Sequence, residues 1–363
     1  MIFPHSATGR DVTSTGTVRS GMLILAAAIV GWAYTLAVLT PAMPVVARTA
    51  PMPGGDGEIF LWVAELRWTA ILLAALGLLT VLAGRRGAAL GPVLLTVLLL
   101  GVDSVLERSG AAGGSGLALA LFSGALAAAA AGWLGGRLGP GTELPVVRRR
   151  LAVVAIVAAG CAPLPLAQGT PAVNHPFLPV GLSVLTAVLP VLLTALAAVA
   201  VVAARPRRIP LVAVLGVAAP PALALAGLGL ATGRGLDQSL TSRATLVAVP
   251  LAVLVVALLR RHPVGRPVRT GALWTTLTLV SAVASPVLVI GGAFLSMITS
   301  SILFEIAGRY YPADGVSVLP GAVLLALAVG LPLAAQLVDA AAPDHPGPAT
   351  DAGPRPAPPP AVA

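Results

Sequence analysis

The chain has 363 residues, a formal net charge of +9 and a mean hydropathy of +0.97, with 57% hydrophobic and only 10% charged residues. A water-soluble globular protein carries about 25% charged residues, so this composition excludes that class and indicates a protein whose solvent is lipid. The arginines lie in short clusters between apolar runs and not along one polar face. This pattern is typical of orientation signals in membrane proteins, and it argues against nucleic acid as a partner.

After a polar segment, 1–20, the chain becomes a series of apolar runs. A helix rises about 1.5 Å per residue and the hydrocarbon layer is about 30 Å thick, so about 20 apolar residues suffice to cross it. We therefore predict an all-α fold, a polytopic integral membrane helical bundle with about ten transmembrane helices in a domain that covers 21–339. The expected spans are 21–40, 59–83, 88–107, 117–135, 151–168, 180–203, 211–232, 244–259, 272–295 and 320–338.

The arginines also predict the orientation of these spans. If the N-terminus is cytoplasmic, most arginines fall in cytoplasmic connections and most acidic residues lie outside, as the positive-inside rule requires. Both termini are then cytoplasmic in a multi-pass cell-membrane protein, which we expect in the plasma membrane of a bacterium. The proline-rich segment 340–363 has almost nothing apolar to bury and is predicted to be a disordered cytoplasmic tail. A cleavable signal peptide in the first run is the alternative for the N-terminus.

Four ionisable residues form a candidate polar cluster: Glu65, Arg67, Asp103 and Glu107. Counted from the inner ends of the second and third spans, Arg67 and Asp103 lie at similar depths of about 24 and 23 Å. Only residues 84–87 join these spans, so the helices must lie side by side and an Arg67–Asp103 ion pair is predicted, with Glu65 and Glu107 one turn further out. The cluster is either a proton or cation relay, the floor of a substrate vestibule, or a structural feature that fixes helix register or reaches the headgroups. Its position in the outer third favours the structural interpretation.

Prolines interrupt several later spans. Pro220 and Pro221 lie near the middle of the seventh span, and Pro286 lies in the ninth. Each removes a backbone donor, so we consider these positions candidate helix breaks of the kind that transporters place around a substrate. Ordinary kinks are the alternative and the more common outcome.

The outer connection 296–319 is predicted to contain a short helix on the membrane surface. Apolar residues recur there at helical spacing, and Glu305 and Arg309 form an i, i+4 pair in the favoured order. Tyr310 and Tyr311 suit the membrane interface. This segment is either a lid or a plain connector.

The sequence contains no recognisable catalytic or cofactor motif. The four histidines lack metal-binding spacing, and no nucleophile or dinucleotide fingerprint occurs. We therefore expect no cofactor and no metal, and we name no catalytic residue. Gly132 and Gly136 form a small-xxx-small pair, which predicts close helix contact within the chain or with a second copy.

Three functions fit these features. The first is a secondary transporter or permease for a small solute. The second is a non-catalytic scaffold, subunit or assembly factor that works with a membrane protein partner or with further copies of itself. The third is a membrane enzyme that acts at the outer face on a lipid-linked substrate, with carboxylates among Asp56, Glu58, Asp103 and Glu305. The lipid bilayer is a partner in each case.

Overall fold

The structure is a computed structural model that describes residues 15–43, 56–139, 143–163, 165, 180–204 and 300–308, together with 276, 280 and 298. Nearly all of these residues are helical, and the described part contains no β-strand. Its helices are α1 (Thr15–Tyr34), α2 (Asp56–Leu82), α3 (Leu90–Arg108), α4 (Gly113–Arg137), α5 (Leu144–Cys161) and α6 (Val180–Ala204). Residues 300–306 form a further helical segment.

Five segments of the described part are long and apolar enough to cross a membrane: Thr15–Ala42, Trp62–Leu82, Leu90–Arg108, Gly113–Arg137 and Val184–Ala204. The all-helical class is therefore confirmed, and several helices of this kind are compatible with a multi-pass membrane protein. The seventh to tenth spans and both ends of the chain lie largely or wholly outside the described residues. The count of ten and the location of the termini stay predictions.

Helix α5 differs most from its predicted span. It was expected at 151–168 but begins at Leu144 and ends at Cys161. Pro145 lies in its first turn, where the missing N–H has no intrahelical partner to lose, and Pro163 restricts the chain just after its end. The helix therefore includes the three arginines at 148–150, and it is not among the five segments apolar enough to cross a membrane. Pro190, in contrast, is accommodated inside a continuous α6.

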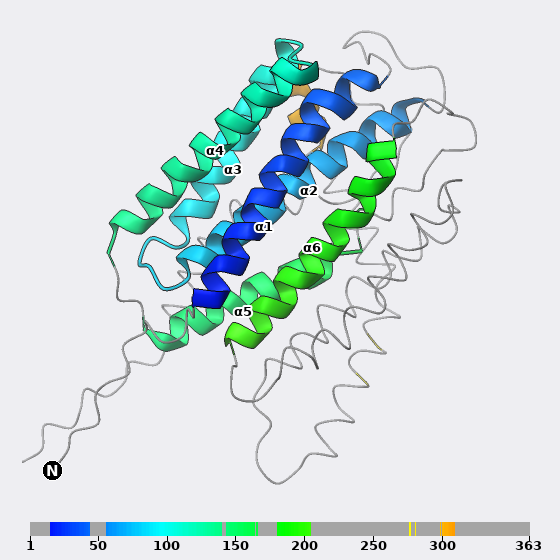
Figure 1. The fold of residues 1–363 in the computed structure, drawn as a ribbon. Helices are drawn as coiled ribbons and strands as arrows, with labels where there is room; N and C mark the ends of the chain where they lie inside the picture. The colour runs from blue at the N-terminus through cyan, green and yellow to red at the C-terminus, as the bar shows by residue number, and fades with distance from the viewer. Residues whose placement is uncertain are drawn as a thin grey trace, which may run out of the picture.

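Helix α2 is the central element of the described bundle. It packs against α1, α3, α4, α5 and α6, and every residue from Trp62 to Thr80 is buried. A helix that is apolar around its whole circumference has no face that favours water, so it lies inside a bundle. Figure 1 shows α1, α2, α3, α4 and α6 running side by side along one long axis.

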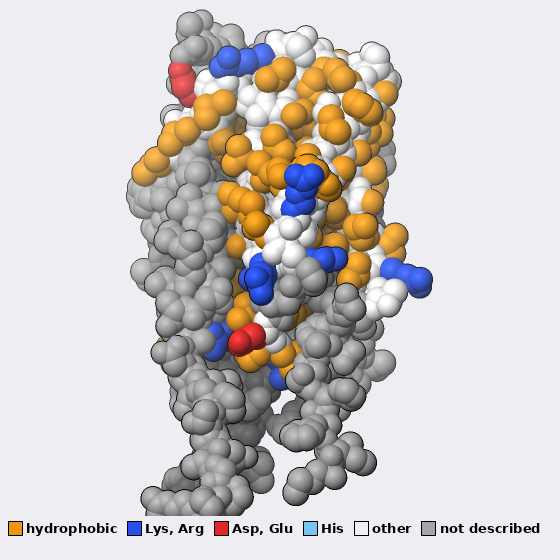
Figure 2. All heavy atoms as spheres, turned by 90° about the vertical axis from the view of Figure 1, so that its left-hand side faces the viewer, with side chains coloured by type: hydrophobic (Ala, Val, Ile, Leu, Met, Phe, Trp, Pro, Cys, Tyr) orange, Lys and Arg blue, Asp and Glu red, His pale blue; other side chains and the backbone are white. Residues whose placement is uncertain are grey.

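Helix α4 has the opposite character and lies at the edge of the bundle. Leu119, Phe122 and Leu126 are between 48 and 68% exposed. In Figure 2 the described part of this side of the molecule shows large apolar areas interrupted by arginines. This surface suits contact with lipid acyl chains.

Two local devices end the helices of the α2–α3 hairpin. After α3, Gly110 has φ +67° and the N–H of Ala111 donates to the carbonyl of Leu106 at 3.1 Å, a Schellman arrangement that satisfies a terminal carbonyl. At the end of α2, Arg150 from α5 donates to the carbonyls of Ala83 at 3.0 Å and Arg85 at 2.7 Å. The positive side chain is favourable at this negative helix end.

The close glycine contact of α4 involves a neighbour of the predicted pair. A Cβ at Gly135 would lie 2.7 Å from Leu82 Cδ1 and 3.3 Å from the Cα of Gly91, whereas one at Gly136 would meet nothing within 4 Å. A Cβ at Gly132 would meet only Leu78 within 4 Å, with the Leu78 Cδ1 at 3.7 Å. Close contact within the chain is therefore present, but Gly135 makes it, and the spacing of 132 and 136 did not identify it.

Candidate functional site

Helices α2 and α3 bring three charged side chains together. Arg67 Nε lies 3.2 Å from Asp103 Oδ1, and Arg67 Nη2 lies 2.5 Å from Glu107 Oε2. The predicted Arg67–Asp103 ion pair is therefore confirmed. Asp103 and Glu107 are one turn apart on α3 and share a face, so a single guanidinium reaches both carboxylates.

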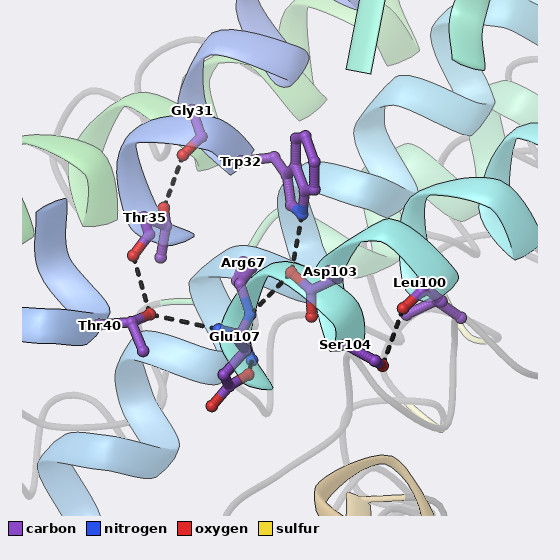
Figure 3. Close-up of polar contacts among 9 residues, drawn as sticks. All are labelled: Gly31, Trp32, Thr35, Thr40, Arg67, Leu100, Asp103, Ser104 and Glu107. Atoms are coloured by element: carbon purple, nitrogen blue, oxygen red, sulfur yellow. Dashed lines mark hydrogen bonds and ion pairs between the residues drawn. The ribbon is translucent and has the colours of Figure 1, made fainter. Parts of the chain in front are cut away.

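Helix α1 and its extension complete this site with neutral groups. Trp32 Nε1 donates to Asp103 Oδ1 at 2.9 Å, and Arg67 Nη1 donates to Thr40 Oγ1 at 3.2 Å. Figure 3 shows these side chains converging from α1 and its extension, from α2 and from α3. We call Trp32, Thr40, Arg67, Asp103 and Glu107 the Arg67 network.

The end of α1 changes its helical type beside this network. Thr35–Leu39 is a π-helical turn and Thr40–Ala42 a 3-10 turn. Thr35 Oγ1 donates to the carbonyl of Gly31 at 2.6 Å, and Thr40 Oγ1 donates to the carbonyl of Thr35 at 2.9 Å (Figure 3). These bonds hold the Thr40 oxygen where it accepts from Arg67. Single π turns of this kind recur at functional sites.

The network is buried inside protein. Arg67 is 2% exposed, Asp103 3% and Glu107 5%. The interpretation in which these charges reach the headgroups is therefore wrong, because they contact side chains of α1, α2 and α3 instead. Buried charges of this kind persist where they are paired and hydrogen-bonded, as they are here.

Glu65 does not join the network, contrary to the predicted cluster of four. It is 1% exposed, and neither of its carboxylate oxygens accepts a hydrogen bond from the described residues. Arg67 is two positions after Glu65, which corresponds to about 200° around a helix of 3.6 residues per turn. The two side chains therefore leave α2 on opposite sides.

The predicted outer lid is described only in part. Residues 300–306 are helical as expected, and Glu305 is exposed. Phe304 of this segment contacts the bundle, and its ring meets Trp68 of α2 edge-on with centroids 5.6 Å apart. Ile302 and Ile306, two members of the expected apolar stripe, are about half exposed, at 51% and 49%.

Several predicted residues lie outside the described part of the chain. They are Arg309, Tyr310, Tyr311, Pro220, Pro221 and Pro286. Within the described residues, no group of three histidine, cysteine or acidic side chains has the arrangement of a metal site.

Sequence reasoning missed three residues that matter to this site. Trp32 and Thr40 supply two of the polar contacts of the network, and Arg150 closes the inner end of α2. An indole and a hydroxyl within an apolar run give no sequence signal of their partners. The arginine cluster was interpreted only as an orientation signal, although a run of three at one helix start leaves at least one facing the bundle.

Comparisons with known proteins add no identity to this picture. The chain matches no family model, and neither curated proteins nor solved structures gave a match. The arrangement itself is a buried cation held between two carboxylates. Such a group can exchange partners with a charged ligand if one of its ion pairs opens.

Proposed function

We propose that the protein is a secondary transporter or permease that moves a small solute across the plasma membrane of a bacterium, by ten transmembrane helices with both termini in the cytoplasm. The observation that carries this proposal is the Arg67 network, in which three charged side chains are buried among helices long and apolar enough to cross a membrane. Each charge at a helix centre costs about 2.5 to 3.5 kcal/mol on insertion scales, so ionisable groups at membrane depth mark pathways and binding sites by default.

A purely structural role gives a weaker account of the same residues. A buried ion pair is often no more stabilising than well-packed apolar side chains of similar volume. Helix register in this bundle is already fixed by close contacts such as that of Gly135 with the α2–α3 hairpin. Charges that add little stability have a use if their partners change during a transport cycle. Arg67 of α2 has its two carboxylate partners on α3 and its hydroxyl partner, Thr40, on the extension of α1, so a movement between these helices would change the pairing.

Solute-induced currents in proteoliposomes test the proposal directly. The full chain is reconstituted and exposed to concentration jumps of amino acids, sugars, organic cations and organic anions, class by class. The variant Asp103→Asn removes one charge and keeps the side-chain shape. Ser104→Ala is the matched control, because Ser104 Oγ donates only to the carbonyl of Leu100 at 2.9 Å.

We expect at least one solute class to produce a current in the wild type and in Ser104→Ala, and Asp103→Asn to abolish it. Gel filtration and circular dichroism verify that each variant is folded. If a folded Asp103→Asn variant carries the wild-type current, the network is not part of the pathway. If no class of solute produces a current or an uptake of labelled solute above that of empty liposomes, the protein is not a transporter of these solutes and the scaffold function replaces this one.

A further inference from the structure

Glu65 occupies a face of α2 that the Arg67 network does not reach. Its side chain is 1% exposed, and its two oxygens lack a hydrogen-bond partner among the described residues. An ionised carboxylate without a partner is strongly unfavourable away from water. Since no described residue supplies a counter-charge, the position favours a proton on the carboxylate itself or a bound cation.

Other unsatisfied polar atoms lie along the same face of α2. Trp62 and Thr69 are three residues before and four residues after Glu65, so the three side chains form one row on the helix. Trp62 Nε1 and Thr69 Oγ1 are fully buried and also have no hydrogen-bond partner in the described part of the chain. One helix face thus carries the two carboxylate oxygens of Glu65 with one unused donor on each side of them.

The helical segment 300–306 approaches the neighbouring surface of α2. Phe304 contacts Trp68, which is three residues from Glu65 and adjacent to it on the helix surface. Ser300 is one turn from Phe304 and on the same face, is 0% exposed, and has a buried Oγ without a described partner. Both sides of this contact therefore contain polar atoms with unused hydrogen-bonding capacity.

No described charge compensates Glu65. On α2 itself, Arg67 points to the opposite side and pairs with Asp103 and Glu107. Helix α6 has no charged residue. The charged or titratable side chains on the other elements packed against α2 are Arg19 and Tyr34 of α1, Asp103, Glu107 and Arg108 of α3, Arg137 of α4, Arg148, Arg149, Arg150 and Cys161 of α5, and the exposed Glu305. None of these described groups forms an ion pair or hydrogen bond with Glu65.

We propose that Glu65 is a proton-binding site inside the bundle, with the row of Trp62, Glu65 and Thr69 as its setting. A metal cation of the hard type needs several oxygen ligands, whereas this row offers one carboxylate, one hydroxyl and an indole N–H that cannot be a ligand. A proton needs only one carboxylate oxygen. It is taken from water by forming an O–H bond and returned to water by breaking the same bond.

Use of this proton as the coupling ion rests on the proposed transport function. In that role Glu65 takes up the proton when its face of α2 is open to one side of the membrane and releases it when that face is open to the other. Proton binding itself does not depend on transport, so the two can be tested separately.

Infrared difference spectroscopy on the reconstituted full chain tests proton binding. Spectra taken at stepped pH should show a C=O stretch of a protonated carboxyl that lacks hydrogen bonds, and deuterium exchange should shift it. The band should disappear in Glu65→Gln and remain in Glu305→Gln, which makes the same chemical change at an exposed glutamate. In Glu65→Asp the band should persist at a shifted frequency, which assigns it to position 65 even if Glu65→Gln folds poorly.

A band that survives in folded Glu65→Gln, or no such band in the wild type at any pH, would overturn the proposal. So would loss of the wild-type band when Na⁺ is added at constant pH, because a metal cation would then be the occupant. In proteoliposomes supplied with a labelled solute, Glu65→Gln should abolish accumulation driven by a pH gradient and retain exchange of labelled for unlabelled solute without a gradient. If the band depends on Glu65 but no solute gives a current in any variant, the proton site stands and the transport function fails.

Discussion

Replacing Arg67 by methionine removes the one cation of the network and keeps an apolar side chain of comparable length. Asp103 and Glu107 then lose their ion pairs while both remain at most 5% exposed, and Thr40 loses a donor. Breaking a buried ion pair by removing one partner costs about 3 to 5 kcal/mol, because the remaining charge is uncompensated. We expect Arg67→Met to lower the free energy of unfolding by that amount, roughly a hundred- to several-thousand-fold in the folding equilibrium.

The triple variant Arg67→Met/Asp103→Asn/Glu107→Gln separates this cause from a simple loss of contacts. It has no uncompensated charge, so it should recover to within about 2 kcal/mol of the wild type. Reversible unfolding in mixed micelles, with denaturing detergent as the variable, gives the free energies of all three proteins. A loss below about 1 kcal/mol in Arg67→Met, or a triple variant no more stable than the single one, would refute the electrostatic reasoning.

Three further changes follow from particular contacts and use the same unfolding measurement. Trp32→Phe keeps an aromatic side chain, smaller than the indole, and removes the N–H donor to a buried carboxylate, so it should cost about 1.5 to 3 kcal/mol; no change would mean that the 2.9 Å bond adds nothing. Gly135→Ala places a Cβ 2.7 Å from Leu82 Cδ1 and should lower the free energy of unfolding by about 1 to 3 kcal/mol. The control Gly136→Ala should change it by no more than about 0.5 kcal/mol, and equal effects of the two variants would contradict the close contact at Gly135. Phe304→Ala removes the edge-on ring contact and should cost at least about 1 kcal/mol; a neutral result would show that this contact does not hold the 300–306 segment against α2.

The Arg67–Asp103 pair could be predicted from the sequence because few variables decide it. A short connection, expected at 84–87 and observed between Leu82 and Leu90, forces two helices to run antiparallel and side by side. Counting residues from that connection gives each charge its depth. The remaining uncertainty was the direction of each side chain around its helix. Glu65 was predicted to join the cluster because its depth in the helix is close to that of Arg67. It lies two positions before Arg67, on the opposite face of α2, and so does not reach the network.

Other parts of the site were not predictable from periodicity. The π turn Thr35–Leu39 shifts the helical phase at the end of α1, so the position of Thr40 beside Arg67 does not follow from a regular helix. The choice of Gly135 over Gly132 and Gly136 depends on how α4 is rotated against the α2–α3 hairpin, which the spacing alone leaves open. The start of α5 at Leu144 was missed because the prediction followed apolar runs and excluded the arginines that this helix contains.

The Arg67 network lies at membrane depth only if α2 and α3 cross the bilayer. The direct measurement is cysteine labelling in a Cys161→Ser background, with a membrane-impermeant maleimide applied to right-side-out and inside-out vesicles. Arg86 in the α2–α3 turn and Ser109 after α3 are both exposed and lie at opposite ends of α3. We predict that Arg86→Cys is labelled only from the cytoplasmic side and Ser109→Cys only from the outer side, whereas labelling of both from the same side would contradict the membrane-crossing arrangement.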